Sequence, residues 1–208
     1  MPLPPDNNLR QFLLFAFALI IPCFALWTVA MGFIAMPAVG LADMILEFWF
    51  PAAVDGLQFQ GGKAVLMTQF GELNGAPVPQ EQSEYQLAFL INPGILSYSL
   101  PFYATLHFAT AKDSYLNSFV TGLFVLYPLV LVGLLSLCLK ELMVNLGTLF
   151  LEQPGAPNAT FIALFYQLNV LIVPTVAPIV LWVWQSRDTP LLRDVLNLGA
   201  APEEAESL

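Results

Sequence analysis

Long apolar stretches without a charged side chain alternate along the chain with short polar connections. Four such stretches cover residues 11–42, 85–111, 114–139 and 153–186. The hydrocarbon core of a bilayer is about 30 Å thick, so a helix needs roughly 20 mostly apolar residues to cross it. The pattern therefore predicts a membrane protein that is mainly α, with a four-helix transmembrane bundle.

The first apolar stretch is too long for a cleaved secretory signal. Such a signal has an apolar core of only about 7–15 residues, whereas residues 11–37 are predicted to form a retained first crossing. Pro22 lies near its middle, where the missing N–H is expected to bend the helix.

The spacing of polar positions changes after Pro37. Asp43 and Glu47 lie four residues apart among apolar neighbours that include Leu46 and Trp49. This spacing is typical of an amphipathic helix along the membrane surface, with Trp49 as an interfacial anchor. A second amphipathic piece is expected over residues 141–151.

Alternation with a period of two replaces the helical pattern between residues 54 and 91. Residues 57–60 alternate, Gly61 and Gly62 give a turn signal, and residues 64–70 and 85–91 are two further extended runs. An open sheet in lipid would leave the polar groups of its edges unsatisfied. We therefore predict a small extracytoplasmic antiparallel β segment that rests on the bundle.

The second crossing is the shortest of the four. It covers residues 94–110 and follows Asn92 and Pro93, and a proline in the first helical turn loses no hydrogen bond. A re-entrant hairpin is the alternative for this segment, because Pro101 interrupts it.

The third and fourth crossings are longer but also contain proline. Pro128 is expected to kink the third, over residues 115–139. Pro174 and Pro178 predict that the fourth, over residues 160–184, is broken or strongly bent.

The six basic residues predict the orientation. With both termini in the cytoplasm, four lie inside (Arg10, Lys112, Arg187 and Arg193) and two outside (Lys63 and Lys140), as the positive-inside rule favours. The expected order is a cytoplasmic N-terminus (1–10), the first crossing (11–37), an extracytoplasmic amphipathic helix and β segment (38–93), the second crossing (94–110), the third (115–139), an extracytoplasmic amphipathic connection (140–159), the fourth (160–184) and a cytoplasmic tail (185–208).

Composition supports the membrane class. Hydrophobic residues make up 58% of the 208 residues and charged residues 10%, against about 25% charged in a typical soluble domain. The net charge of −9 is scattered and no basic patch is present, so we expect the lipid bilayer as a partner and no nucleic acid.

Side chains suited to catalysis are few. His107 is the only histidine, and an ionisable group inside a membrane helix is a functional candidate. The alternative is a neutral imidazole bonded to a backbone carbonyl. Cys23 and Cys138 are expected at different depths as small apolar side chains. The sequence therefore predicts neither a metal site nor a cofactor.

Three polar side chains are expected inside the bundle. Asn117, Gln167 and Asn169 are predicted to bond across helices, each contributing about 0.5–2 kcal/mol. The alternative is that Gln167 and Asn169 line a transport pathway.

One motif resembles a known family. Residues 92–101, Asn-Pro-Gly-Ile-Leu-Ser-Tyr-Ser-Leu-Pro, follow segment 46–51 and the hairpin in an order that resembles the exosortase H-associated membrane proteins of bacteria. Asn92, Pro93, Tyr98 and Pro101 match the motif positions, and position 99 is Ser where Gly is expected. The resemblance covers about residues 10–185. It implies an inner-membrane accessory of a protein-sorting transpeptidase system, with no catalytic residue to carry over.

The leading hypothesis is a non-enzymatic accessory subunit that packs against another integral membrane protein, by the resemblance an exosortase. The exosortases themselves need a membrane-embedded cysteine with basic partners on later helices, and this chain has no arginine between Arg10 and Arg187. One alternative is a small transporter or lipid-handling protein, which the proline-broken helices favour. Another is a membrane enzyme acting through His107.

Overall fold

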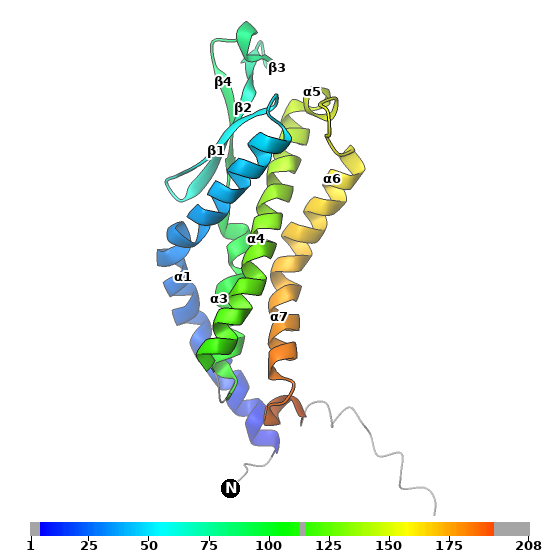
Figure 1. The fold of residues 1–208 in the computed structure, drawn as a ribbon. Coiled ribbons are helices and arrows are strands. Elements are labelled where there is room, and N and C mark those ends of the chain that lie inside the picture. The colour runs from blue at the N-terminus through cyan, green and yellow to red at the C-terminus, as the bar shows by residue number, and fades with distance from the viewer. Residues whose placement is uncertain (1–4, 113–114, 194–208) are drawn as a thin grey trace, which may run out of the picture.

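The computed structural model describes residues 5–112 and 115–193 and shows a helical column capped at one end by a small sheet (Figure 1). The helices are α1 (Pro5–Trp49), α2 (Gly94–Ser97), α3 (Ser99–Ala109), α4 (Tyr115–Leu146), α5 (Thr148–Leu151), α6 (Ala159–Tyr166), the π-helical segment η2 (Gln167–Ile172) and α7 (Val173–Ser186). The strands are β1 (Val54–Gln60), β2 (Lys63–Leu73), β3 (Ala76–Pro79) and β4 (Gln86–Ile91), and a 3-10 turn, η1 (Gln80–Gln82), precedes β4. Residues 194–208 of the predicted tail lie outside the described residues.

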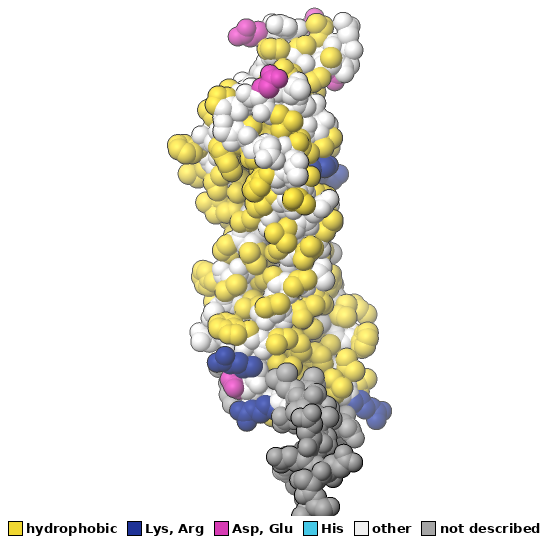
Figure 2. Space-filling view, turned by 90° about the vertical axis from the view of Figure 1, so that its right-hand side faces the viewer, with side chains coloured by type: hydrophobic (Ala, Val, Ile, Leu, Met, Phe, Trp, Pro, Cys, Tyr) yellow, Lys and Arg dark blue, Asp and Glu magenta, His cyan; other side chains and the backbone are white. Residues whose placement is uncertain are grey.

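Long apolar helices support the predicted membrane class. Among the described residues, three helical segments are long and apolar enough to cross a bilayer: Leu9–Trp49, Tyr115–Leu146 and Ala159–Ser186. Hydrophobic side chains cover the middle of the face in Figure 2, while most of the visible Lys and Arg lie near its lower end and most of the visible Asp and Glu lie near its upper end. This distribution is the one that a bilayer around the middle of the column requires.

Helix α1 corrects the expectation of a separate surface helix after Pro37. It runs without interruption through Pro22 and Pro37 to Trp49, and it bends along the way (Figure 1). At about 1.5 Å per residue its 45 residues extend about 68 Å, more than twice the thickness of the hydrocarbon core. Its C-terminal part therefore extends beyond the membrane-spanning length.

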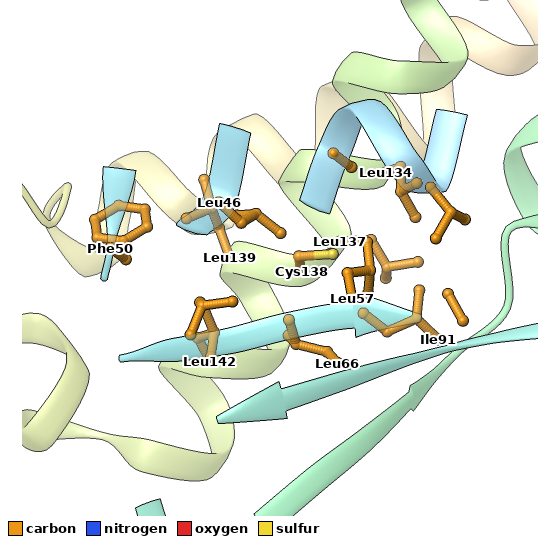
Figure 3. Packing of buried hydrophobic residues seen from close by; sticks show 14 of the residues in the cluster. Leu46, Phe50, Leu57, Leu66, Ile91, Leu134, Leu137, Cys138, Leu139 and Leu142 are labelled. Atoms are coloured by element: carbon orange, nitrogen blue, oxygen red, sulfur yellow. The ribbon is translucent and has the colours of Figure 1, made fainter. Parts of the chain in front are cut away.

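The C-terminal part of α1 is held by the sheet. Leu46 and Phe50 are buried in the main hydrophobic core, together with Leu57 and Leu66 of the sheet and Leu142 of α4 (Figure 3). A position along the membrane surface would leave these contacts unmade, so burial against the sheet and α4 decides where this segment lies.

The acidic face of the same segment points at the sheet edge. The Asp43 carboxylate accepts a hydrogen bond from the backbone N–H of Leu57 in β1. Glu47 lies nearby, since a Cβ built on Gly56 would be 3.6 Å from an oxygen of each carboxylate. The two acidic residues that predicted a surface helix therefore cover the outer edge of β1, which would otherwise offer unpaired backbone donors.

The small antiparallel sheet and its predicted hairpin are confirmed. Strands β1 and β2 pair up to Gln60 and Lys63, and the turn residues Gly61 and Gly62 have φ values of 59° and 82°. Strand β4 also pairs with β2. Strand β3 was not predicted, because its two prolines argue against a strand; they are tolerated at the sheet edge, where β3 pairs with the end of β2.

Helix α4 also continues further than expected. It reaches Leu146, so the amphipathic piece expected over residues 141–151 is divided between the end of α4 and the short helix α5. Gly147, with a φ of 57°, ends α4. Leu142 and Leu146 belong to the core beneath the sheet, which explains why the helix extends to this point.

The predicted disruption of the last apolar stretch is present as η2. Pro174 stands at the start of α7 and supplies no backbone N–H, so the regular α-helical pattern cannot continue from α6 into α7. The wider π turn takes up the mismatch.

The segment formed by α2 and α3 runs from the sheet to the opposite end of the column (Figure 1). At that end Phe108 and Ala109 of α3 share a cavity of about 370 Å³ with Gln11 and Phe12 of α1. The segment therefore lies beside the longer helices over most of the bundle.

Candidate functional site

The motif of residues 92–101 joins the sheet to the bundle. The Asn92 side-chain oxygen accepts a hydrogen bond from the Gly94 N–H at 3.0 Å. The N–H groups of Leu96 and Ser97 donate to the Pro93 carbonyl at 3.1 and 3.2 Å. Asn92 and Pro93 thus end β4 and begin α2 within a few residues.

Polar contacts tie this motif to two long helices. The indole N–H of Trp27 in α1 donates to Ser97 Oγ at 3.2 Å. The hydroxyl of Tyr98 lies 2.7 Å from Thr175 Oγ1 in α7, within hydrogen-bond distance. The motif therefore fixes α1 and α7 at one level of the bundle.

Close packing ties the motif to α4. A Cβ on Gly133 of α4 would lie only 2.9 Å from Leu96 Cδ2, so a larger residue at this position would have to displace the Leu96 side chain. Ser99 stands where a glycine was expected, yet it is buried and donates from Oγ to the Leu96 carbonyl at 3.0 Å. Its hydroxyl thus bonds back from the start of α3 to the preceding helix α2. Pro101 is also buried, and its carbonyl accepts from Thr105 Oγ1 at 2.8 Å.

A second polar cluster lies toward the other end of the bundle. The Tyr103 hydroxyl donates to Gln185 Oε1 at 2.6 Å and lies 3.1 Å from the Ser118 carbonyl. Gln185 Nε2 donates to the same carbonyl at 3.0 Å. These contacts join α3, α4 and α7. The i, i+4 spacing of Tyr103 and His107 is the sequence signal that the two share a helix face.

His107 is completely buried beside this cluster. Its Nε2 lies 2.9 Å from the Tyr115 carbonyl, and its Nδ1 lies 3.3 Å from the Tyr103 hydroxyl and 3.5 Å from Lys112 Nζ. A neutral imidazole with the proton on Nε2 donates to the Tyr115 carbonyl and accepts at Nδ1 from Lys112, since the single Tyr103 hydroxyl hydrogen is given to Gln185. The geometry suits a side chain that connects the end of α3 to the start of α4.

The loop after α3 contains Lys112, a lysine with a lowered pKa. Burial lowers the pKa of Lys112 to about 8. The neighbouring Thr110 Oγ1 accepts from the indole N–H of Trp182 in α7 at 2.8 Å. This loop is therefore held against α7 and not free in solvent.

The three polar residues expected to bond across helices do not gather in one place. Asn169 is buried, but its amide donates to the Phe165 carbonyl of its own helical segment at 2.9 Å. Gln167 and Asn117 are exposed on the outside of the bundle. Bonds between helices come instead from Tyr98 of the motif and from Trp27, Tyr103, Gln185 and Trp182, and the sequence analysis did not single out the last four.

Metal ligation finds no support in residues 5–112 and 115–193. No group of three or more His, Cys, Asp or Glu side chains there is placed to hold an ion. Cys138 is buried in the core beneath the sheet, while Cys23 lies half-buried on α1. The two thiols therefore occupy different parts of the column.

A family comparison extends over both clusters. The family model described as exosortase H-associated membrane protein matches residues 6–189. Comparisons with curated proteins and with solved structures gave no match. Since the matched segment includes the 92–101 motif and nearly all of the described fold, the chain belongs to the exosortase H-associated membrane protein family.

Proposed function

We propose that the chain is a non-enzymatic accessory subunit that binds an exosortase-type sorting enzyme in the bacterial inner membrane. Family membership is the observation that carries this proposal. The architecture supports it, because the core beneath the sheet couples an extramembrane head, formed by the sheet and the adjoining ends of α1 and α4, to the membrane bundle.

The proposed topology has four crossings and cytoplasmic termini. The α2–α3 segment, Gly94 to Ala109, extends about 24 Å at 1.5 Å per residue, a few ångströms less than the hydrocarbon core. Local thinning of the bilayer accommodates a mismatch of this size at modest cost. The Lys and Arg side chains at the lower end in Figure 2 support a cytoplasmic location for that end.

Exposed apolar side chains on the head support a partner contact outside the membrane. Tyr85 and Leu90 are 74% and 67% exposed on or beside β4, and Phe48 is 91% exposed near the end of α1. In the proposed topology these three side chains face water and not lipid. Apolar groups left in water on a small head are typical of a protein interface.

The proposal is tested by co-expression with a tagged exosortase H from the same organism and purification in mild detergent. We expect the chain to copurify in stoichiometric amount, and Leu90→Glu to reduce its recovery. Gln58→Glu is the matched control, because Gln58 is an exposed strand residue that is already polar. Recovery of the free chain alone, under conditions that keep the enzyme folded, would contradict the proposal.

A further inference from the structure

An apolar groove of about 810 Å³ opens between α1 on one side and α3 and α4 on the other. Its rims include Leu26 and Phe33 of α1 and Phe124 of α4, which are all more than 70% exposed. Small side chains, Ala30 and Ala104, lie between the larger ones. The groove is thus a recess in the surface that the bilayer surrounds.

The polar side-chain atoms of Trp27 and Tyr127 in the groove lining already form hydrogen bonds within the protein. The indole N–H of Trp27 donates to Ser97 Oγ, and the Tyr127 hydroxyl donates to the Ile34 carbonyl at 3.0 Å. The remaining lining is hydrocarbon, aromatic ring or the thiol of Cys23. An occupant of this groove therefore gains apolar contact and no new hydrogen bond, which suits a hydrocarbon chain.

The size of the groove suits a hydrocarbon chain. The lining residues on α1 run from Cys23 to Pro37, about 21 Å at 1.5 Å per residue. The groove volume falls within the range of about 300–1,000 Å³ that is usual for small-molecule sites.

The groove continues toward the basic end of the bundle. Phe108 lines both the groove and the cavity of about 370 Å³ between the ends of α1 and α3. That cavity is lined by Gln11 and Ala111, the neighbours in sequence of Arg10 and Lys112. An uncharged groove that leads toward the end of the bundle where Arg10 and Lys112 lie complements an amphiphile with a negative headgroup.

We propose that the groove binds one acyl chain of an anionic glycerophospholipid, whose headgroup lies at the basic end near Arg10 and Lys112. This lipid site is separate from the proposed partner surface on the head. It goes beyond the accessory role, since a bound lipid would fill the recess between α1, α3 and α4.

The test uses the full chain in nanodiscs with equal amounts of phosphatidylglycerol and phosphatidylethanolamine, followed by extraction and native mass spectrometry. We expect retention of one phosphatidylglycerol. Ala30→Phe should fill the groove and reduce lipid retention by about tenfold, which corresponds to a loss of about 1.4 kcal/mol of binding free energy. Ala25→Phe is the matched control, because Ala25 lies on the exposed side of the same helix.

A substitution near the proposed headgroup position tests the contribution of charge separately from that of the apolar groove. Lys112→Gln should keep one bound lipid but remove the preference for phosphatidylglycerol, whereas Lys63→Gln, at the sheet end, should leave the preference unchanged. Equal lipid retention by Ala30→Phe and Ala25→Phe would overturn the proposal. So would loss of exosortase binding in Ala30→Phe with lipid retention unchanged, because a partner helix would then be the occupant.

Discussion

The hydroxyl of Tyr103 in α3 donates to Gln185 Oε1 in α7 at 2.6 Å, and this bond is made by a tyrosine that is completely buried. Replacing Tyr103 by Phe removes the donor and leaves the Gln185 oxygen without it. We expect Tyr103→Phe to lower the free energy of unfolding by about 0.5–1.5 kcal/mol. Thermal unfolding in detergent measures the change, and Tyr85→Phe, on an exposed loop, should leave stability unaltered.

Gly122 of α4 lies directly against the same tyrosine. A Cβ at Gly122 would be 2.0 Å from the Tyr103 hydroxyl oxygen, so Gly122→Ala must displace the ring. We expect a loss of about 1–3 kcal/mol, as is usual for overpacking. Gly40→Ala is a matched control in α1, since a Cβ there meets nothing within 4 Å. It should raise stability by about 0.5–1 kcal/mol, and equal effects at both sites would contradict the packing.

Asp43 fixes the edge of the sheet through the N–H of Leu57. Asp43→Ala leaves that donor unpaired, which costs about 1–3 kcal/mol when the group stays buried. We expect faster amide hydrogen exchange at Leu57 and its strand neighbours. Asp43→Asn, which keeps an acceptor oxygen, should retain most of the protection. Exchange at Leu57 that is the same in all three chains would show that the contact does not hold the strand.

Lys112 should show an unusual dependence on pH. Burial lowers its pKa from 10.5 to about 8, so in the folded chain the neutral amine forms near pH 8, and in the unfolded chain only near pH 10.5. Between these values the unfolded state binds more protons, and the contribution of Lys112 to stability therefore rises with pH. At pH 8 the native chain should react faster at Lys112 with an acylating reagent than the denatured chain, as peptide mass spectrometry can show. A slower native reaction throughout would contradict the shift.

The orientation is open to cysteine labelling in intact cells. A cysteine at Gln58, exposed on β1, should react with a membrane-impermeant thiol reagent added from outside. A cysteine at Asp188, exposed near the opposite end, should react only after the membrane is opened. The parent chain, with Cys23 and Cys138, measures the background. The reverse pattern would invert the proposed topology.

Local sequence predicts the elements whose signals are local. The uncharged stretches identify the long helices, Gly61 and Gly62 identify the hairpin, and Pro174 identifies the region where η2 interrupts the last stretch. The resemblance carried by Asn92, Pro93, Tyr98 and Pro101 is confirmed by the family comparison.

Contacts between distant segments decide the rest. Residues 38–49 carry the same amphipathic pattern whether their apolar face meets lipid or a sheet. Only the burial of Leu46 and Phe50 against strands that come later in the chain distinguishes the two. Likewise the bond between Tyr103 and Gln185 joins residues 82 positions apart. No pattern within one helix points to it, so sequence reasoning chose Gln167 and Asn169 instead.

Because α1 is one unbroken helix, the position of the sheet is linked to the tilt of α1 in the bundle. Because the helix carries the sheet at one end and lies in the bundle over much of its length, a change in its tilt moves the sheet sideways. Membrane thickness influences helix tilt, so we expect the lateral position of the sheet to depend on the thickness of the bilayer around the bundle.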